Sequence, residues 1–129
     1  MKTEASGRLA GKIAVVTGAG LGIGHGSALC MAAEGADLAI MDIDAAALAA
    51  TSEEIRALGR RVFAQRVDCT DERAVVDAFA AIKRDYGRVD ILMNNVGQSA
   101  REKATEFWQS QPDTWRFVFG VSLFPTLLC

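Results

Sequence analysis

Four glycines lie close together in the segment Thr17-Gly18-Ala19-Gly20-Leu21-Gly22-Ile23-Gly24. An apolar run precedes this segment and helix-forming residues follow it, which is the context in which a glycine pattern indicates phosphate binding. Gly18 permits a sharp turn, Gly22 lets backbone N–H groups approach a pyrophosphate, and Gly24 lets a helix and a strand pack closely. A tight turn alone is the alternative, but it does not need four glycines. We therefore expect a cofactor that carries a pyrophosphate to bind here, with its phosphates at the helix N-terminus. It should contact Gly18, Leu21, Gly22, Ile23 and Gly24.

An acidic residue stands where a dinucleotide would present its adenosine ribose. Asp42 closes the next apolar run, eighteen residues after Gly24, and an acid meets the ribose hydroxyls at an offset of roughly twenty residues in dinucleotide-binding proteins. Its carboxylate would accept hydrogen bonds from the 2′- and 3′-hydroxyls and repel a 2′-phosphate, so the sequence favours NAD over NADP. The alternative role, capping the next helix, could be filled equally well by Asp44.

The elements that must position these residues alternate along the chain. Apolar runs typical of buried parallel strands cover residues 12–17, 37–41 and 89–93, and an alternating pattern over residues 61–67 predicts a further strand. Helix-forming stretches, each followed by a glycine that can end a helix, cover residues 27–34, 45–58 and 71–86. A polar loop then runs to about residue 111. Pro112 begins a last helix, which Pro125 should kink or stop because it lacks the N–H for a helical hydrogen bond.

This alternation predicts an α/β fold, a doubly wound parallel sheet with right-handed crossovers and the strand order 3-2-1-4. Residues 1–10 are polar and aperiodic, so we expect a flexible arm there. Residues 11–129 should form one dinucleotide-binding domain, because their number is that of a single globular domain.

The composition excludes several classes of protein. Half of the residues are apolar, which is enough for a core, and the net charge of −2 supplies no field that would attract nucleic acid or an anionic membrane. No apolar stretch is long enough to span a bilayer and the first residues lack a signal peptide, so we expect a soluble, cytoplasmic chain. Three scattered cysteines and one histidine suggest neither a disulfide framework nor a metal site.

Two motifs resemble the signatures of the short-chain dehydrogenase/reductase family. Thr17 to Gly24 is similar to its T-G-x-x-x-G-x-G motif, and Asn94 to Gly97 is similar to its N-N-A-G motif. Asp68, at the end of the third expected strand, matches the family acid that binds the adenine ring, and Cys69 lies beside it. The resemblance runs from about Arg8 to Leu128. It implies a Rossmann fold, a nicotinamide cofactor, and hydride transfer between that cofactor and an alcohol or ketone.

The resemblance also implies roles for single residues. Asn95 would support the central sheet, while the backbone of Val96 and Gly97 would line the cofactor ribose; ordinary turn chemistry is the alternative for the asparagines. Ser122 stands where the family has a catalytic asparagine, and its backbone carbonyl could still hold a relay water. The family's catalytic serine and its Tyr-x-x-x-Lys lie on the next strand and helix, beyond residue 129. The chain would then supply the cofactor-binding half and be inactive alone.

Several other side chains invite a structural interpretation. Tyr86, the sole tyrosine, is not followed by a lysine four residues later, so we expect a packing residue. His25 should be a solvated residue at the start of its helix rather than a phosphate ligand.

Without a fifth strand, residues 91–93 would form an open edge, which favours homo-oligomers or aggregates. An aromatic tail packs either on the domain core or on a partner subunit; its members are Trp108, Trp115, Phe117, Phe119 and Phe124.

Two functional alternatives come from other classes of protein. A dinucleotide-binding module without catalysis, acting as a sensor or a partner subunit, would also account for Ser122. An S-adenosylmethionine-dependent methyltransferase would likewise have a glycine loop after its first strand. Thr17 argues against the methyltransferase, because those enzymes usually have an acid near that strand end.

Overall fold

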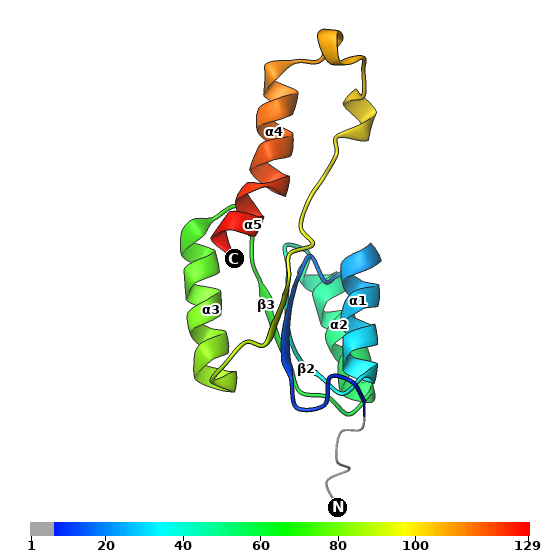
Figure 1. Ribbon diagram of the computed structural model, residues 1–129, viewed down its shortest axis with the longest axis vertical. Helices are drawn as coiled ribbons and strands as arrows, with labels where there is room; N and C mark the ends of the chain where they lie inside the picture. The colour runs from blue at the N-terminus through cyan, green and yellow to red at the C-terminus, as the bar shows by residue number, and fades with distance from the viewer. Residues whose placement is uncertain (1–6) are drawn as a thin grey trace, which may run out of the picture.

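The computed structural model describes residues 7–129, in which strands and helices follow one another in the expected order (Figure 1). The strands are β1 (Ile13–Thr17), β2 (Asp37–Asp42), β3 (Val62–Arg66) and β4 (Ile91–Met93). The helices are α1 (Gly22–Ala33), α2 (Ala45–Ala57), α3 (Glu72–Tyr86), α4 (Pro112–Ser122) and α5 (Phe124–Leu128). Two short 3₁₀ turns, Arg101–Lys103 and Phe107–Gln109, lie within the segment expected as a polar loop.

The four strands form one parallel sheet in the order β3-β2-β1-β4, which confirms the predicted fold class and strand order. Val15 at the centre of β1 pairs with Ala39 of β2 and Leu92 of β4. Because all strands run the same way, their carboxyl ends meet at one edge of the sheet. The strand order changes direction at β1, with β2 and β3 on one side and β4 on the other, so a topological switch point lies at that edge, the usual place for a ligand in such sheets.

Helices cover both faces of the sheet, and this is why residues 13–16 of β1 and 38–41 of β2 are all apolar and buried. Successive side chains of a strand point to opposite faces. One face packs against α1 and α2 through Ala14, Val16, Leu38 and Ile40. The other packs against α3 through Val15, Ala39 and Met41. Because both faces of the sheet are buried, its central strands do not alternate between apolar and polar residues, as a strand with one exposed face would.

Helix α1 begins at Gly22, five residues before the predicted start at residue 27. Glycine disfavours helix interiors, so local propensity alone argues against this first turn. Tertiary packing overrides that propensity, because Gly24 is buried where α1 crosses the turn after β1. The other boundaries lie within two residues of the prediction, apart from the division of the last helix.

The last helix is divided in two, as Pro125 predicted. Helix α4 ends at Ser122, Leu123 separates the two segments, and Pro125 is buried in the first turn of α5. The break turns α5 toward the sheet, where Leu128 and Cys129 pack against the α3-side core.

The described part of the expected arm, residues 7–10, is folded onto the domain. Leu9 donates its backbone N–H to the carbonyl oxygen of Glu34 at 2.8 Å, and the Arg8 guanidinium pairs with the Glu34 carboxylate at 3.1 Å. This pairing lowers the pKa of Glu34, mainly through the side-chain hydrogen bond from Arg8. The remainder of the expected arm, residues 1–6, lies outside the described residues.

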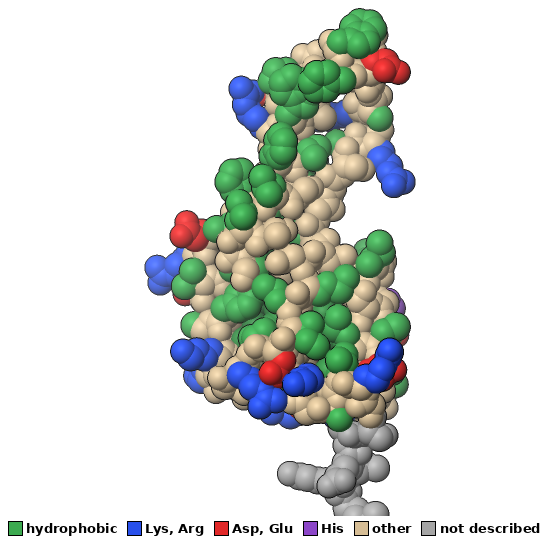
Figure 2. Space-filling model, viewed as in Figure 1, with side chains coloured by type: hydrophobic (Ala, Val, Ile, Leu, Met, Phe, Trp, Pro, Cys, Tyr) green, Lys and Arg blue, Asp and Glu red, His purple; other side chains and the backbone are tan. Residues whose placement is uncertain are grey.

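The segment from the first 3₁₀ turn to α5 carries much of the exposed apolar surface (Figure 2). Phe107 and Trp108 are 81% and 78% exposed, and Phe119 is 58% exposed. The aromatic tail therefore lies largely outside the core. Its Trp115 stacks on the exposed Phe107, with ring centroids 5.9 Å apart. Within residues 7–129, none of the helices combines the length and apolar character needed to cross a membrane.

Candidate dinucleotide-binding site

A cavity of about 420 Å³ opens at the carboxyl edge of the sheet. Most of the residues singled out in the sequence line it, namely Gly18, Leu21, Asp42, Asp68, Cys69, Asn95, Val96 and Gly97. Sequence reasoning missed Ile43, Val67, Thr70, Gln98 and Val121. These side chains carry no distinctive chemistry, so only their positions in the chain could have indicated them. They follow the ends of β2, β3 and β4 or, for Val121, belong to α4.

The glycine-rich turn is shaped by close approach as well as by backbone freedom. Gly18 and Gly22 have φ values of +65° and +59°, which other residues rarely adopt. Gly24 lacks space instead, because a Cβ there would lie 2.1 Å from the carbonyl oxygen of Gly18 and 2.6 Å from Asn95 Nδ2. Gly24 is therefore a buried packing residue, as expected for the contact of helix and strand, but it does not line the cavity where a cofactor contact was expected.

The N-terminus of α1 differs from those of α2 and α3. Asp44 and Asp71 cap α2 and α3 by accepting hydrogen bonds from backbone N–H groups. At α1 the capping residue is Leu21, which makes no side-chain cap, and the first turn contains no acidic residue. Helix α1 therefore presents uncapped N–H groups and the positive end of its dipole beside the cavity, which suits a phosphate. Gly22 and Ile23 lie on this first turn, and the Ile23 side chain is exposed rather than in the cavity.

Asp42 lies half-buried at the lip of the cavity and does not cap α2, because Asp44 performs that task. Its Oδ2 accepts a hydrogen bond from the backbone N–H of Gly20 at 2.8 Å, and its Oδ1 accepts one from the backbone N–H of Asp44 at 2.9 Å. These bonds fix the orientation of the carboxylate. Each oxygen has further acceptor capacity, so hydroxyl donors from a ligand could still bind.

Thr17 and Asn95 join the carboxyl ends of β1 and β4. The Thr17 hydroxyl oxygen accepts hydrogen bonds from the backbone N–H groups of Asn95 at 3.0 Å and Val96 at 3.3 Å. Asn95 Nδ2 donates to the carbonyl oxygen of Gly18 at 3.1 Å. The asparagine therefore ties the end of β4 to the glycine-rich turn, which is more than ordinary turn chemistry and agrees with the supporting role that the resemblance implied. The role of Thr17 was not foreseen.

Asp68 and Cys69 form the wall beyond β3. Asp68 Oδ1 accepts hydrogen bonds from the Thr70 hydroxyl at 2.7 Å and the Thr70 backbone N–H at 2.9 Å, and these bonds lower the pKa of the carboxyl. The carboxylate is exposed at the cavity and carries its charge there. Burial of Cys69 raises the pKa of its thiol to about 12, so this wall is neutral and apolar beside the acid. Cys30, Cys69 and Cys129 are all free thiols.

Ser122 does not line the cavity but contacts the segment that does. Its hydroxyl accepts a hydrogen bond from the backbone N–H of Gln98 at 3.1 Å and donates one to the Gln98 carbonyl oxygen at 2.9 Å. The Ser122 carbonyl, considered above as a holder of a relay water, lies 3.4 Å from the hydroxyl oxygen of Thr126.

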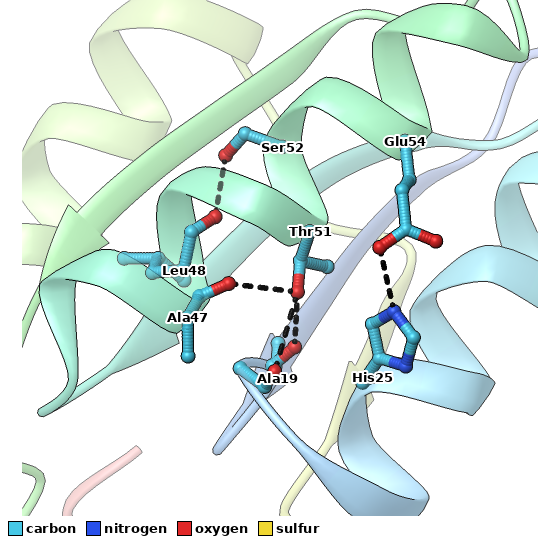
Figure 3. A network of polar contacts seen from close by, with 8 residues as sticks. Ala19, His25, Ala47, Leu48, Thr51, Ser52 and Glu54 are labelled. Atoms are coloured by element: carbon cyan, nitrogen blue, oxygen red, sulfur yellow. Dashed lines mark hydrogen bonds and ion pairs between the residues drawn. The ribbon is translucent and has the colours of Figure 1, made fainter.

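Helix α2 supports the turn from behind (Figure 3). Thr51 is buried, and its hydroxyl lies 3.1 Å from the carbonyl oxygens of Ala19 and Ala47. His25 is not a solvated cap residue, because its Nε2 lies 3.0 Å from Glu54 Oε1 and so joins α1 to α2. The sequence gives no signal for this contact, because Thr51 is one threonine within an alanine-rich helix.

Tyr86 is confirmed as a packing residue. Its hydroxyl donates to the carbonyl oxygen of Leu38 at 3.0 Å, near the start of β2, and the Arg61 guanidinium lies over its ring at 4.4 Å from the centroid. Burial of the side chain raises the pKa of the phenol. The tyrosine therefore lies at the amino-terminal edge of the sheet, opposite the cavity. Residues 7–129 contain no cluster of His, Cys, Asp or Glu side chains that could hold a metal ion.

The parallel sheet, the uncapped helix behind a glycine-rich turn and the acid after β2 define a Rossmann dinucleotide-binding domain. The family model described as short chain dehydrogenase matches residues 12–129, and the chain belongs to this family of oxidoreductases. The methyltransferase alternative is thereby set aside.

Individual relatives support the same assignment. The chain is 46% identical over 93 residues to a 7alpha-hydroxysteroid dehydrogenase of Escherichia coli (strain K12), covering 70% of this chain and 35% of the relative. It is 37% identical over 116 residues to a 2-dehydro-3-deoxy-D-gluconate 5-dehydrogenase of Pseudoalteromonas atlantica, covering 89% of this chain and 44% of the relative.

Two solved structures share the fold. One is a short chain dehydrogenase/reductase from Burkholderia phymatum in complex with NAD, with a TM-score of 0.82 and 34% identity over 97% of this chain and 42% of that chain. The other is a carveol dehydrogenase from Mycobacterium avium in complex with NAD, with a TM-score of 0.89 and 27% identity over 95% of this chain and 48% of that chain. The chain spans less than half the length of these relatives.

Proposed function

We propose that this chain is the NAD-binding half of an NAD-dependent oxidoreductase whose complete form moves a hydride between the cofactor and an alcohol or ketone. The observation that carries the proposal is the Asp42 carboxylate, which is held at the lip of the cavity by two backbone N–H groups. Two of the solved relatives are complexes with NAD by their own descriptions, which supports the choice of cofactor.

The residues present fit a dinucleotide. The cavity volume of about 420 Å³ is typical of sites for small ligands. In front of α1, the position that a Cβ on Gly22 would take is in open space, so the uncapped N–H groups are accessible to a phosphate. The Asp68 carboxylate and the neighbouring apolar wall could hold the amino group and the ring of an adenine.

Charge decides the choice between NAD and NADP. A 2′-phosphate would meet the Asp42 carboxylate, and no Lys or Arg occurs between Gly18 and Gly26 to compensate it. Arg66, which pairs in register with Asp42, donates its Nε to the carbonyl oxygen of Ile43 at 2.8 Å. This bond uses one donor of the guanidinium on the backbone, and Arg66 is not among the residues that line the cavity.

In the complete enzyme the bound nicotinamide would supply the hydride acceptor or donor. The residues of this chain would bind and orient the dinucleotide: the first turn of α1 its phosphates, Asp42 its adenosine ribose, and Asn95 to Gly97 the strand end over which it lies. The proton transfer that accompanies hydride transfer requires an acid or base within hydrogen-bond reach of the substrate oxygen. By the family resemblance, that group belongs to the half of the enzyme after residue 129.

Calorimetric titration of the 129-residue chain with NAD and with NADP tests the proposal. We expect NAD to bind, and to bind more tightly than NADP. Gly22→Leu should abolish binding because its side chain would fill the space in front of α1. Gly59→Leu is the matched control, since Gly59 also has a positive φ, +76°, and open space around its Cβ position, but lies at the end of α2 away from the cavity.

Both substitutions carry a similar backbone strain of about 1–2 kcal/mol, so only a direct role in binding separates them. Tighter binding of NADP by the parent chain would overturn the NAD assignment and would make Arg66 the candidate partner of the 2′-phosphate. Equal losses of affinity in both leucine variants would overturn the placement of the phosphates at α1.

A further inference from the structure

The segment that follows β4 is held at two points. At its beginning, the Thr17 hydroxyl accepts the backbone N–H groups of Asn95 and Val96. At its end, the Ser122 hydroxyl makes a reciprocal pair of hydrogen bonds with the backbone of Gln98, accepting from N–H at 3.1 Å and donating to C=O at 2.9 Å. Between these points the chain passes along the cavity through Val96 and Gly97.

The second attachment depends on side-chain chemistry rather than on regular structure. Gln98 lies beyond the last residue of β4, so its backbone has no strand partner. A single hydroxyl can satisfy both of its backbone groups because it carries one donor and two acceptor lone pairs. The contact is close on the Gly97 side as well, where a Cβ would lie 3.3 Å from Ser122 Oγ.

The position of Ser122 is fixed by the break between α4 and α5. It is the last residue of α4, immediately before the break at Leu123, and the buried Pro125 anchors the start of α5. Its neighbour Val121 lines the cavity. The hydroxyl therefore links the end of α4 to the cavity wall formed after β4.

We propose that Ser122 is a positioning residue for the cofactor: its hydroxyl holds Gly97 and Gln98 in the conformation that lines the dinucleotide cavity. The serine touches neither the cavity nor a reacting atom, so it acts through the Gln98 backbone. This inference rests on the proposed function, because it names what orders one wall of that same site. Without the hydroxyl, the Gly97–Gln98 backbone would sample other conformations, and binding NAD would first have to order it.

Three variants of the 129-residue chain test the proposal by calorimetric titration with NAD and by hydrogen exchange at the Gln98 amide. Ser122→Ala removes both hydrogen bonds. Ser122→Asn restores them, because a carboxamide carries a donor and an acceptor side by side. Ser110→Ala is the matched control, since the Ser110 hydroxyl also bonds at an end of α4, to Phe107 and Trp115, but away from the cavity.

We expect Ser122→Ala to weaken NAD binding about five- to tenfold, the net effect of roughly one hydrogen bond, and to speed exchange at Gln98. Ser122→Asn should return both values toward those of the parent chain, and Ser110→Ala should leave both unchanged. Unaltered NAD affinity in Ser122→Ala would overturn the proposal, and so would equal losses in Ser122→Ala and Ser110→Ala, which would indicate general destabilisation.

The two proposals fail in different ways. If the parent chain does not bind NAD, the proposed function is wrong, and the exchange rate at Gln98 still decides whether Ser122 orders this wall. If the parent chain binds NAD and Ser122→Ala binds it equally well, the proposed function stands and the positioning role is wrong.

Discussion

The Asp42 carboxylate accepts a hydrogen bond from the backbone N–H of Gly20 at 2.8 Å, although 22 residues separate them in the chain. A Cβ on Gly20 would itself lie 2.8 Å from the same carboxylate oxygen. The glycine-rich turn and the acid after β2 are therefore one unit, in which the absence of a side chain at Gly20 lets the carboxylate approach. Disturbing either residue should alter how the other meets a ligand.

Replacing Asp42 by alanine should weaken NAD binding by roughly ten- to a hundredfold, because hydrogen bonds to a charged group contribute about 1.5–3 kcal/mol. NADP should lose less, so discrimination between the cofactors narrows. Titration with both cofactors measures this. Asp44→Ala is the control: it removes the cap of α2, costing about 1 kcal/mol of stability, and should keep the parent preference. An unchanged preference in Asp42→Ala would show that another residue discriminates.

Two glycines of α1 should respond in opposite directions to alanine. Gly24→Ala places a Cβ 2.1 Å from the Gly18 carbonyl oxygen, and such overpacking costs about 1–3 kcal/mol or more. Gly26→Ala places its Cβ in open space and should stabilise the helix by up to about 1 kcal/mol. Denaturant unfolding measures both free energies. Equal effects of the two substitutions would contradict the close packing of Gly24.

Stability should fall in acid partly through Asp90. Its Oδ2 accepts hydrogen bonds from the Ile13 backbone N–H at 2.8 Å and from Arg88 Nε at 2.9 Å, and the former contributes most to lowering the pKa of the carboxyl. A lowered folded-state pKa stabilises the protein above the unfolded pKa, and this stabilisation is lost as the pH falls through the folded-state value.

Asp90→Asn should therefore lower the melting temperature near neutrality and flatten its decline between about pH 5 and 3. Thermal unfolding across that range tests this. Asp77→Asn, which removes an exposed pair with Arg73 on α3, should leave the shape of the decline unaltered. A decline in Asp90→Asn as steep as in the parent chain would refute the role of Asp90.

The open edge of the sheet should promote association. Leu92 of the edge strand β4 is 38% exposed, and Phe119 of α4 is 58% exposed. We expect dimers or larger species at roughly tens of micromolar, where exposed edges and apolar surface associate. Sedimentation of Leu92→Lys and of Phe119→Lys shows whether the β4 edge or the exposed side of α4 forms the contact between chains. Only the substitution that lies in this contact should restore monomers. A parent chain that sediments as a monomer at that concentration would contradict this expectation.

These 129 residues alone should bind NAD without oxidising a secondary alcohol above the background rate. The ionisable side chains that line the cavity are Asp42, Asp68 and Cys69, and they lie where the adenosine half would bind. Losing general acid–base help typically lowers a rate by about a hundred- to ten-thousandfold. NADH production that exceeds the buffer rate and disappears in Gly22→Leu would show that the chain or its assembly supplies a catalytic group.

The order of the elements and most of the residues that line the cavity could be predicted from the sequence, for a local physical reason. Strands buried on both faces must be continuously apolar, as residues 13–16 are, and a close turn into a helix requires glycine. Each of these features lies within a few consecutive residues. The acid after β2 and the asparagines after β4 likewise follow apolar runs directly, so the parallel sheet brings them to one edge.

Only the tertiary structure decided the contacts between segments far apart in the chain. The early start of α1 depends on the fit of Gly24 against Gly18. The support of the turn by Thr51 and the hold of Ser122 on Gln98 join residues 32 and 24 positions apart. Serine and threonine hydroxyls bond to whichever backbone group lies within reach, so their residue type predicts that they bond but not where. That partner is chosen by the packing of whole helices against the sheet.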